Sequence, residues 1–161
     1  MRKDVVVLRI ENIFHTGVVV PDVHRAIVEY SKILNTEWTE PVDRTLSLRG
    51  PSGPYRIDIA LAYTRRGPHY IELVQAVADS LWEQPSGSAA AHHTGVWSDD
   101  LTADSAALEA AGSPLLATVD DGSSNPRHWA YHRLANGTLI ELVDASRRAA
   151  LERWFAGGSF S

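Results

Sequence analysis

The sequence of 161 residues predicts an α+β fold made of two tandem modules, each a strand, a helix and three further strands. The segment His-Thr-Gly-Val at 15–18 recurs at 93–96, 78 residues later, and an Asp follows four residues after each copy. A second segment, Ile-Glu-Leu-Val at 71–74, recurs unchanged at 140–143. Strand and helix patterns in the same order accompany these segments in both halves. Duplication of one small unit leaves this arrangement.

The first module is predicted to span residues 13–78. Residues 13–20 are rich in β-branched side chains, which indicates a strand. Asp22 then stands where a helix cap belongs, and apolar residues at helical spacing predict a helix over 23–34. The three strands that follow are predicted at 44–48, 55–63 and 70–77.

The second module is predicted to span residues 91–144, after a small, polar linker at 86–91. Asp100 is the expected cap of a helix over 101–111, and Gly112 is expected to end that helix. The three strands that follow are predicted at 115–119, 129–134 and 138–143.

Two features lie outside the strict repeat. The stretch between the two motifs is nine residues longer in the first module, and the Pro/Gly/Ser-rich segment 41–54 is the predicted place of the extra residues. Residues 145–161 are expected to form a C-terminal helix over 146–155 and a tail that frays over 157–161. The chain 1–161 is expected to be one domain.

Composition narrows the functional classes. Hydrophobic residues make up 44% and charged residues 22%, as in an ordinary globular chain. The sequence has no cysteine, which excludes thiol catalysis, iron–sulfur clusters and cysteine zinc sites. A net charge of −5 disfavours nucleic acid and anionic membranes as partners. No apolar run is long enough to span a membrane, residues 1–8 lack a signal-peptide pattern, and a cytoplasmic location is expected.

The repeat places four metal-ligating side chains at matched positions: His15, Glu72, His93 and Glu141. Alternation along a strand puts each Glu on a face with apolar neighbours, where a lone carboxylate is costly to bury. Two equivalent His and two equivalent Glu can converge on one point near a pseudo-twofold axis. This donor set predicts one divalent ion, with Zn, Ni, Co, Mn and Fe all admissible, and Lewis-acid chemistry.

These motifs resemble a known family. The segments Phe14–Asp22, Ile71–Leu73, His92–Val96 and Leu139–Leu142 look like those of the vicinal oxygen chelate superfamily, which includes glyoxalase I, methylmalonyl-CoA epimerase, extradiol dioxygenases and bleomycin-resistance proteins. The likeness is nearest to the epimerase-like branch. It implies a curved mixed sheet around a central cavity, the glyoxalase-like fold, with His15, Glu72, His93 and Glu141 as the metal ligands. It also implies a homodimer, which an exposed sheet edge would favour.

Further residues are candidates for the pocket. Trp129, Tyr131 and Arg133 share one face of a predicted strand, and Trp82 follows the first Glu strand, where a cavity wall is expected. An ordinary cross-strand aromatic pair is the alternative interpretation of Trp129 and Tyr131. His92 should face away from His93 and is interpreted as a structural or interfacial residue.

The leading hypothesis is a metal-dependent isomerase or lyase. The enzyme would polarise a carbonyl or acyl-thioester oxygen of a small molecule and move the adjacent proton through an enolate, with Glu141 or Glu72 as the base. One alternative is a non-catalytic small-molecule binder of the resistance type. A second alternative is an Fe(II) extradiol dioxygenase, although such enzymes use two His and only one carboxylate.

Overall fold

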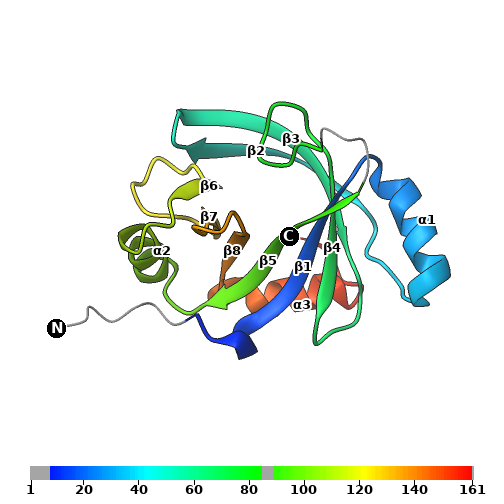
Figure 1. The fold of residues 1–161 in the computed structure, drawn as a ribbon. Coiled ribbons are helices and arrows are strands. Elements are labelled where there is room, and N and C mark those ends of the chain that lie inside the picture. The colour runs from blue at the N-terminus through cyan, green and yellow to red at the C-terminus, as the bar shows by residue number, and fades with distance from the viewer. Residues whose placement is uncertain (1–7, 85–88, 161) are drawn as a thin grey trace.

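Eight strands form one closed barrel in the computed structural model, which describes residues 8–84 and 89–160 (Figure 1). Around the barrel the strands follow the order β1, β4, β3, β2, β6, β7, β8, β5. Their bounds are β1 Ile13–Val20, β2 Val42–Gly50, β3 Gly53–Tyr63, β4 Tyr70–Gln75, β5 Ala90–Ser98, β6 Leu115–Val119, β7 Trp129–Arg133 and β8 Leu139–Asp144. The helices are α1 Val23–Leu34, α2 Leu101–Ala110 and α3 Arg148–Phe155, with short 3-10 turns at Ile10–Asn12 and Ala145–Arg147.

The two predicted modules are confirmed as βαβββ units with the same pairing. In each unit the first strand lies parallel to the last, β1 beside β4 and β5 beside β8. The remaining strands continue antiparallel, β4–β3–β2 in one unit and β8–β7–β6 in the other. The units meet through an antiparallel β1–β5 pair and close through a short β2–β6 pair. The result is the predicted glyoxalase-like fold.

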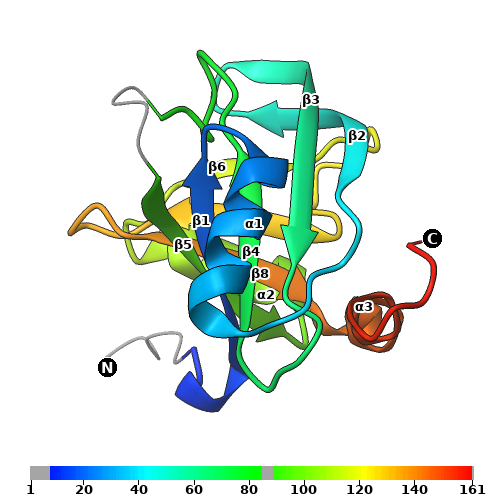
Figure 2. The same cartoon turned by 90° about the vertical axis from the view of Figure 1, so that its right-hand side faces the viewer.

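The helices begin where the sequence indicates. Asp22 accepts a hydrogen bond from the backbone N–H of Arg25, and Asp100 accepts one from Ala103, so both predicted caps are confirmed. Helices α1 and α2 lie outside the barrel on opposite sides (Figures 1 and 2). Each covers the outer face of its own module with buried apolar side chains. This leaves the interior of the barrel to the other face of the strands.

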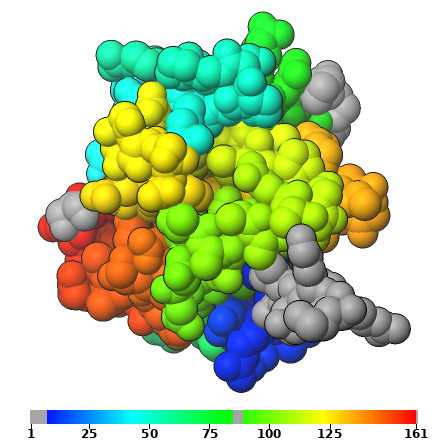
Figure 3. All heavy atoms as spheres, turned by 90° about the vertical axis from the view of Figure 1, so that its left-hand side faces the viewer, coloured from blue at the N-terminus to red at the C-terminus, as the bar shows by residue number. Residues whose placement is uncertain are grey.

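The extra residues of the first module are not one insertion in 41–54, as predicted, but are spread along the module. Helix α1 has 12 residues against 10 in α2. Strands β2 and β3 have 9 and 11 residues, whereas β6 and β7 have 5 each. The long β2–β3 hairpin forms one wall of the barrel interior (Figure 2). From the α2 side, the 120–128 loop lies between that hairpin and α3 (Figure 3), and the Arg49 guanidinium donates to the Ser124 carbonyl at 2.8 Å.

The C-terminal segment covers one end of the barrel interior. Trp154 and Phe155 of α3 are buried against Tyr63 and other aromatic side chains. The tail continues this packing: the Phe160 ring lies 4.4 Å from the Trp154 ring, and the Arg44 guanidinium lies 4.3 Å over Phe160. The expected fraying is therefore wrong for residues 157–160, because Phe160 packs against Trp154 and Arg44 and holds the tail on the barrel.

Some predictions concern residues outside the described ranges, and others are changed or left open by the structure. Residues 1–7, 86–88 and 161, which enter the signal-peptide, linker and tail predictions, lie outside the described residues. Strand β5 begins at Ala90, inside the predicted linker. The barrel closes through only two residue pairs, Leu48 with Val119 and Arg49 with Thr118, so residues 42–47 of β2 pair with β3 but with no second strand of the described chain. The homodimer stays a prediction. No helix in ranges 8–84 and 89–160 is long and apolar enough to cross a membrane.

Candidate metal centre

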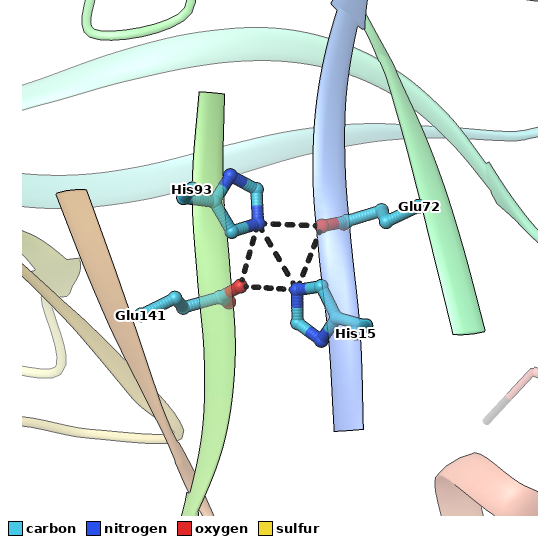
Figure 4. Close-up of side chains that lie close together, drawn as sticks. All are labelled: His15, Glu72, His93 and Glu141. Carbon is cyan, nitrogen blue, oxygen red and sulfur yellow. Dashed lines mark hydrogen bonds and ion pairs between the residues drawn. The ribbon is translucent and has the colours of Figure 1, made fainter. Parts of the chain in front are cut away.

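Four adjacent strands bring the predicted ligands together inside the barrel. His15 lies on β1, Glu72 on β4, His93 on β5 and Glu141 on β8. All four are buried, with exposed fractions of 0 to 6%. One donor atom from each lies within 4.8 Å of all the others (Figure 4). The convergence of the two duplicated pairs is therefore present in the structure.

The donor atoms are spaced as ligands of one ion would be. The Nε2 atoms of His15 and His93 are 3.0 Å apart. From His15 Nε2 to the carboxylate Oε2 atoms the distances are 3.3 Å for Glu72 and 3.0 Å for Glu141. From His93 Nε2 they are 3.0 and 3.1 Å. Separations of about 3 Å are those between neighbouring ligands that each lie about 2.1 Å from a common metal.

Glycine in the repeated His-Thr-Gly motif makes this convergence possible. In the β1–β5 pair, Gly17 stands opposite His93 and Gly95 stands opposite His15. A Cβ on Gly17 would lie 1.9 Å from Cε1 of His93, and a Cβ on Gly95 would lie 1.9 Å from Cε1 of His15. Each module thus supplies one imidazole and the empty space that the other module's imidazole fills. The repeated glycine is therefore as necessary to this geometry as the repeated histidine.

Charge pairing shifts the pKa of each ligand. Burial alone would lower the pKa of His93, but Glu141 and Glu72 outweigh it and raise that pKa to about 9. The same balance raises the pKa of His15. Burial alone would raise the pKa of each glutamate, whereas the two histidines beside them hold both pKa values below the ordinary range. Without a metal, the two carboxylates favour the protonated form of the imidazoles.

A divalent ion fits these residues. Two imidazoles and two carboxylates are a common donor set for first-row divalent metals. The Oε2 atom of Glu141 is buried and has no hydrogen-bond partner in the described part of the chain, although it faces two imidazole nitrogens. An ion at the centre would satisfy that oxygen and replace the protons that the imidazoles otherwise hold. The metal and its identity stay a prediction.

His92 contacts the cluster, contrary to its interpretation as a residue that faces away from His93. Its Nδ1 lies 2.9 Å from Nδ1 of His93, and its Nε2 lies 2.7 Å from the Leu81 carbonyl oxygen. A carbonyl only accepts, so His92 donates from Nε2 and accepts at Nδ1 from the Nδ1–H of His93. This assignment leaves Nε2 of a neutral His93 free to bind a metal. Strand alternation predicts the face on which a side chain starts, but the imidazole of His92 still reaches the ring of its neighbour.

Two tyrosines extend the duplication. Tyr63 stands opposite Glu72 in the β3–β4 pair, and Tyr131 stands opposite Glu141 in the β7–β8 pair. Their rings lie edge-on to His15 at 5.5 Å and to His93 at 5.0 Å. Burial and the nearby carboxylates raise both pKa values well above the ordinary value, so both phenols keep their protons. Sequence reasoning missed Tyr63, although a Tyr nine or ten residues before each Glu was a detectable signal.

A cavity of about 230 Å³ opens onto the two glutamates. Its apolar and aromatic walls come from β2, β3, β6, β7, β8, α3 and the tail. The apolar and aromatic lining residues are Leu46, Leu61, Tyr63, Val119, Trp129, Val143, Leu151, Trp154 and Phe160. Its polar lining residues are Arg44, Glu72, His128, Glu141 and Arg147. The C-terminal segment, which lies outside both modules, therefore contributes to the pocket.

The predicted pocket residues occupy three different places. Trp129 lines the cavity. Tyr131 is buried beside the cluster, with its hydroxyl 3.5 Å from Nε2 of His93. Trp82 lies behind Tyr131 and donates to its hydroxyl at 3.4 Å, so the prediction of Trp82 as a cavity wall is wrong. Arg133 is exposed where β7 ends, since the strand has left the cavity by then, and Arg147 and Arg44 are the arginines of the pocket.

Comparisons with known proteins agree with this fold. A methylmalonyl-CoA epimerase from Mycobacterium tuberculosis is 21% identical, with a TM-score of 0.60 over 87% of this chain and 91% of that chain. A variant of the Streptomyces coelicolor methylmalonyl-CoA epimerase, solved with 2-nitronate-propionyl-CoA, is 17% identical, with a TM-score of 0.59 over 83% of this chain and 96% of that chain. At identities this low, the structural likeness shows a shared fold and nothing more.

The sequence itself matches one family. No curated protein matches the sequence at a significant level. The model of the glyoxalase/bleomycin resistance protein/dioxygenase superfamily matches residues 14–131, which is most of the chain and contains three of the four clustered ligands. The chain therefore belongs to the glyoxalase/bleomycin resistance protein/dioxygenase superfamily.

Proposed function

We propose that this protein is a metal-dependent isomerase or lyase that moves a proton next to a carbonyl or acyl-thioester group of a small molecule. The observation that carries the proposal is the buried His₂Glu₂ cluster whose two glutamates face a mainly apolar cavity. Membership of the superfamily supports an enzyme of this class. The epimerase neighbours, one of them solved with methylmalonyl-CoA, make acyl thioesters one of the substrate classes to test.

The chemistry follows from the residues around the cavity. A divalent ion held by His15, Glu72, His93 and Glu141 would supply Lewis acidity to a carbonyl oxygen. A glutamate at the cavity floor removes the proton from the adjacent carbon and returns it to the same or a neighbouring position. The neutral hydroxyl of Tyr63, which lines the same cavity, can donate a hydrogen bond to the substrate. The apolar walls exclude water from the exchange.

Glu141 is the better candidate for the base. Glu72 accepts a hydrogen bond from Nε2 of His93 at 3.0 Å. Oε2 of Glu141 lies 3.0 and 3.1 Å from the two imidazole nitrogens, but it accepts no hydrogen bond within the described residues. The charge of Glu72 also opposes the lowering of the Glu141 pKa by the histidines. Glu141 is therefore the more weakly held of the two carboxylates, and Glu72 is the alternative base.

Solvent-deuterium exchange tests the proposal. The metal-loaded protein is mixed in D₂O with a panel of small carbonyl compounds and acyl-CoA thioesters, and deuterium at the adjacent carbon is measured. We expect exchange with at least one class of compound, and a loss of about 10²- to 10⁴-fold in Glu141→Gln. Circular dichroism and metal content of the variant separate loss of the base from loss of the fold or the ion. Full exchange in Glu141→Gln would exclude this residue as the base.

Metal analysis separates the rival functions. A purified protein that neither contains nor takes up stoichiometric metal, yet binds small molecules in the cavity, would be a resistance-type binder. An Fe(II) dioxygenase would consume oxygen with a catechol. The second carboxylate in the cluster argues against that chemistry, because the usual Fe(II) site has two His and one carboxylate.

A further inference from the structure

An arginine that makes no ion pair within the described residues lies on the wall of the cavity. Arg147, in the turn that leads into α3, lines the cavity together with Glu141 and Trp129. No hydrogen bond or ion pair of its guanidinium occurs among residues 8–84 and 89–160, in contrast to Arg148 beside it, which pairs with Glu152 at 2.9 Å. Burial lowers the pKa of Arg147, although nearby carboxylates oppose this. A half-buried guanidinium of this kind favours an anionic ligand.

A second arginine reinforces the positive wall. Arg44 of β2 also lines the cavity, and its guanidinium stacks on Phe160 at 4.3 Å. It too makes no ion pair within the part of the chain that the structure describes. Burial, followed by the charges of Arg147 and Arg127, lowers the pKa of His128 on the same wall. The wall that carries Arg44 and Arg147 is thus positive. The two glutamates that line the same cavity already pair with the imidazoles of His15 and His93.

The remaining walls suit a flat apolar group. Trp129, Trp154 and Phe160 line the cavity together with aliphatic side chains. The volume of about 230 Å³ exceeds the roughly 150 Å³ that accommodates a benzene molecule in a protein interior. The cavity therefore has room for one aromatic ring and a short substituent.

We propose that the cavity binds a small aromatic carboxylic acid and that Arg147 holds its carboxylate. The inference deepens the proposed function by naming its substrate class, an aromatic acid that also carries the reacting carbonyl or acyl-thioester group, and it rests on that function only for the step that follows binding. With the carboxylate on Arg147, the body of the acid lies between the aromatic walls and the glutamates of the cluster. Arg147 is then a specificity residue that comes from neither copy of the duplicated module.

Matched ligands test the proposal directly. Phenylacetate and its neutral counterpart phenylacetamide are titrated into metal-free and metal-loaded protein, with tryptophan fluorescence as the readout, because Trp129 and Trp154 line the cavity. We expect phenylacetate to bind about 10- to 100-fold more tightly than the amide in both forms. Arg147→Met should remove this preference by weakening phenylacetate alone, and Arg147→Lys should keep part of it.

The control is the same substitution outside the cavity. Arg133→Met removes an exposed arginine of β7 and should leave both affinities unchanged. Equal affinities for acid and amide, an unchanged preference in Arg147→Met, or no binding of either compound at tens of millimolar would each overturn the proposal. Binding of phenylacetate only to metal-loaded protein, unaffected by Arg147→Met, would place the carboxylate on the metal and also overturn it. Failure of the proposed function would appear instead as absent metal uptake or absent deuterium exchange in the unmodified protein.

Discussion

The two modules supply the same ligands but surround them differently. In the second module His92 contacts Nδ1 of His93, and Trp82 donates to the hydroxyl of Tyr131. In the first module Phe14 takes the place of His92, and Nδ1 of His15 is buried with no hydrogen-bond partner in the described structure. The ring of Tyr63 faces the cavity and α3 instead of a tryptophan N–H.

This difference separates the residues of the candidate metal centre from the residues of the pocket. The duplicated residues are the donors, the glycines and the tyrosines that a centre on a pseudo-twofold axis uses in pairs. Apart from the pair Phe14 and His92, the residues that differ come from segments without a duplicate: the stretch before β5 with Leu81 and Trp82, and the C-terminal segment with Arg147 and Phe160. The side of the centre around His93 is therefore fixed by neighbouring side chains, and the side around Tyr63 is open to a small molecule in the cavity.

The largest effect should come from adding a side chain at the glycine that makes room for the other module's histidine. Gly17→Ala would drive a methyl group into the His93 ring, and Gly95→Ala would drive one into the His15 ring. Because each change displaces a ligand, we expect both variants to lose metal affinity by about 100-fold or more, as measured by competition with a chelator. If the modules are equivalent at the centre, the two losses should agree.

Thr94→Ala is the matched control, because Thr94 lies between the ligand and the glycine of the same motif, on the other face of β5. It should bind metal like the unmodified protein. Normal metal affinity in Gly17→Ala and Gly95→Ala would show that the rings can move aside, and the explanation of the repeated glycine would be wrong.

The next effect concerns pH and the metal-free protein. Because the pKa of His93 is raised to about 9 and that of His15 is raised as well, their contribution to stability is complete below pH 6.5 and disappears as the pH rises through about 9. The lowered pKa values of Glu72 and Glu141 add stability above pH 4.5 that is lost on further acidification. The free energy of unfolding should thus fall by on the order of 2 kcal/mol from pH 6.5 to 9.

Denaturant unfolding at several pH values measures this decline. Zn²⁺ should reverse it, since metal binding requires deprotonated imidazoles and strengthens as the pH rises. Glu72→Gln, which removes one of the two carboxylates, should flatten the profile of the metal-free protein. A metal-free protein equally stable at pH 6.5 and 9 would contradict the charged network.

The sequence alone could predict what the duplication repeats. The repeated His-Thr-Gly-Val and Ile-Glu-Leu-Val segments located all four residues of the candidate centre, and the Asp that follows each His-Thr-Gly-Val segment located the helix caps, since these depend on local pattern. It could not place Arg147 or Phe160 on the cavity, because barrel closure and the packing of α3 bring together segments far apart in the chain. It also misplaced Arg133 and Trp82: alternation predicts a face, but not where a strand leaves the cavity or which ring lies in front.

The smallest effect should come from making the second module resemble the first. His92→Phe introduces the residue that the first module has in the equivalent place, Phe14, and removes the acceptor for the Nδ1–H of His93. Loss of such a supporting hydrogen bond typically weakens metal binding by about 10- to 100-fold, and the lower end is expected because His15 has no such support.

The control is His24→Phe, which changes an exposed histidine of α1 and should leave metal affinity unchanged. His92→Gln, whose side chain offers an acceptor oxygen, should recover part of the loss, which a role in packing alone would not explain. If His92→Phe binds metal as tightly as the unmodified protein, the contact with His93 does not orient the ligand, and the two sides of the centre are equally free. If it weakens binding, the asymmetry between the modules is functional: the half fixed by His92 holds the ion, while the half formed by Tyr63 and the C-terminal segment admits the substrate.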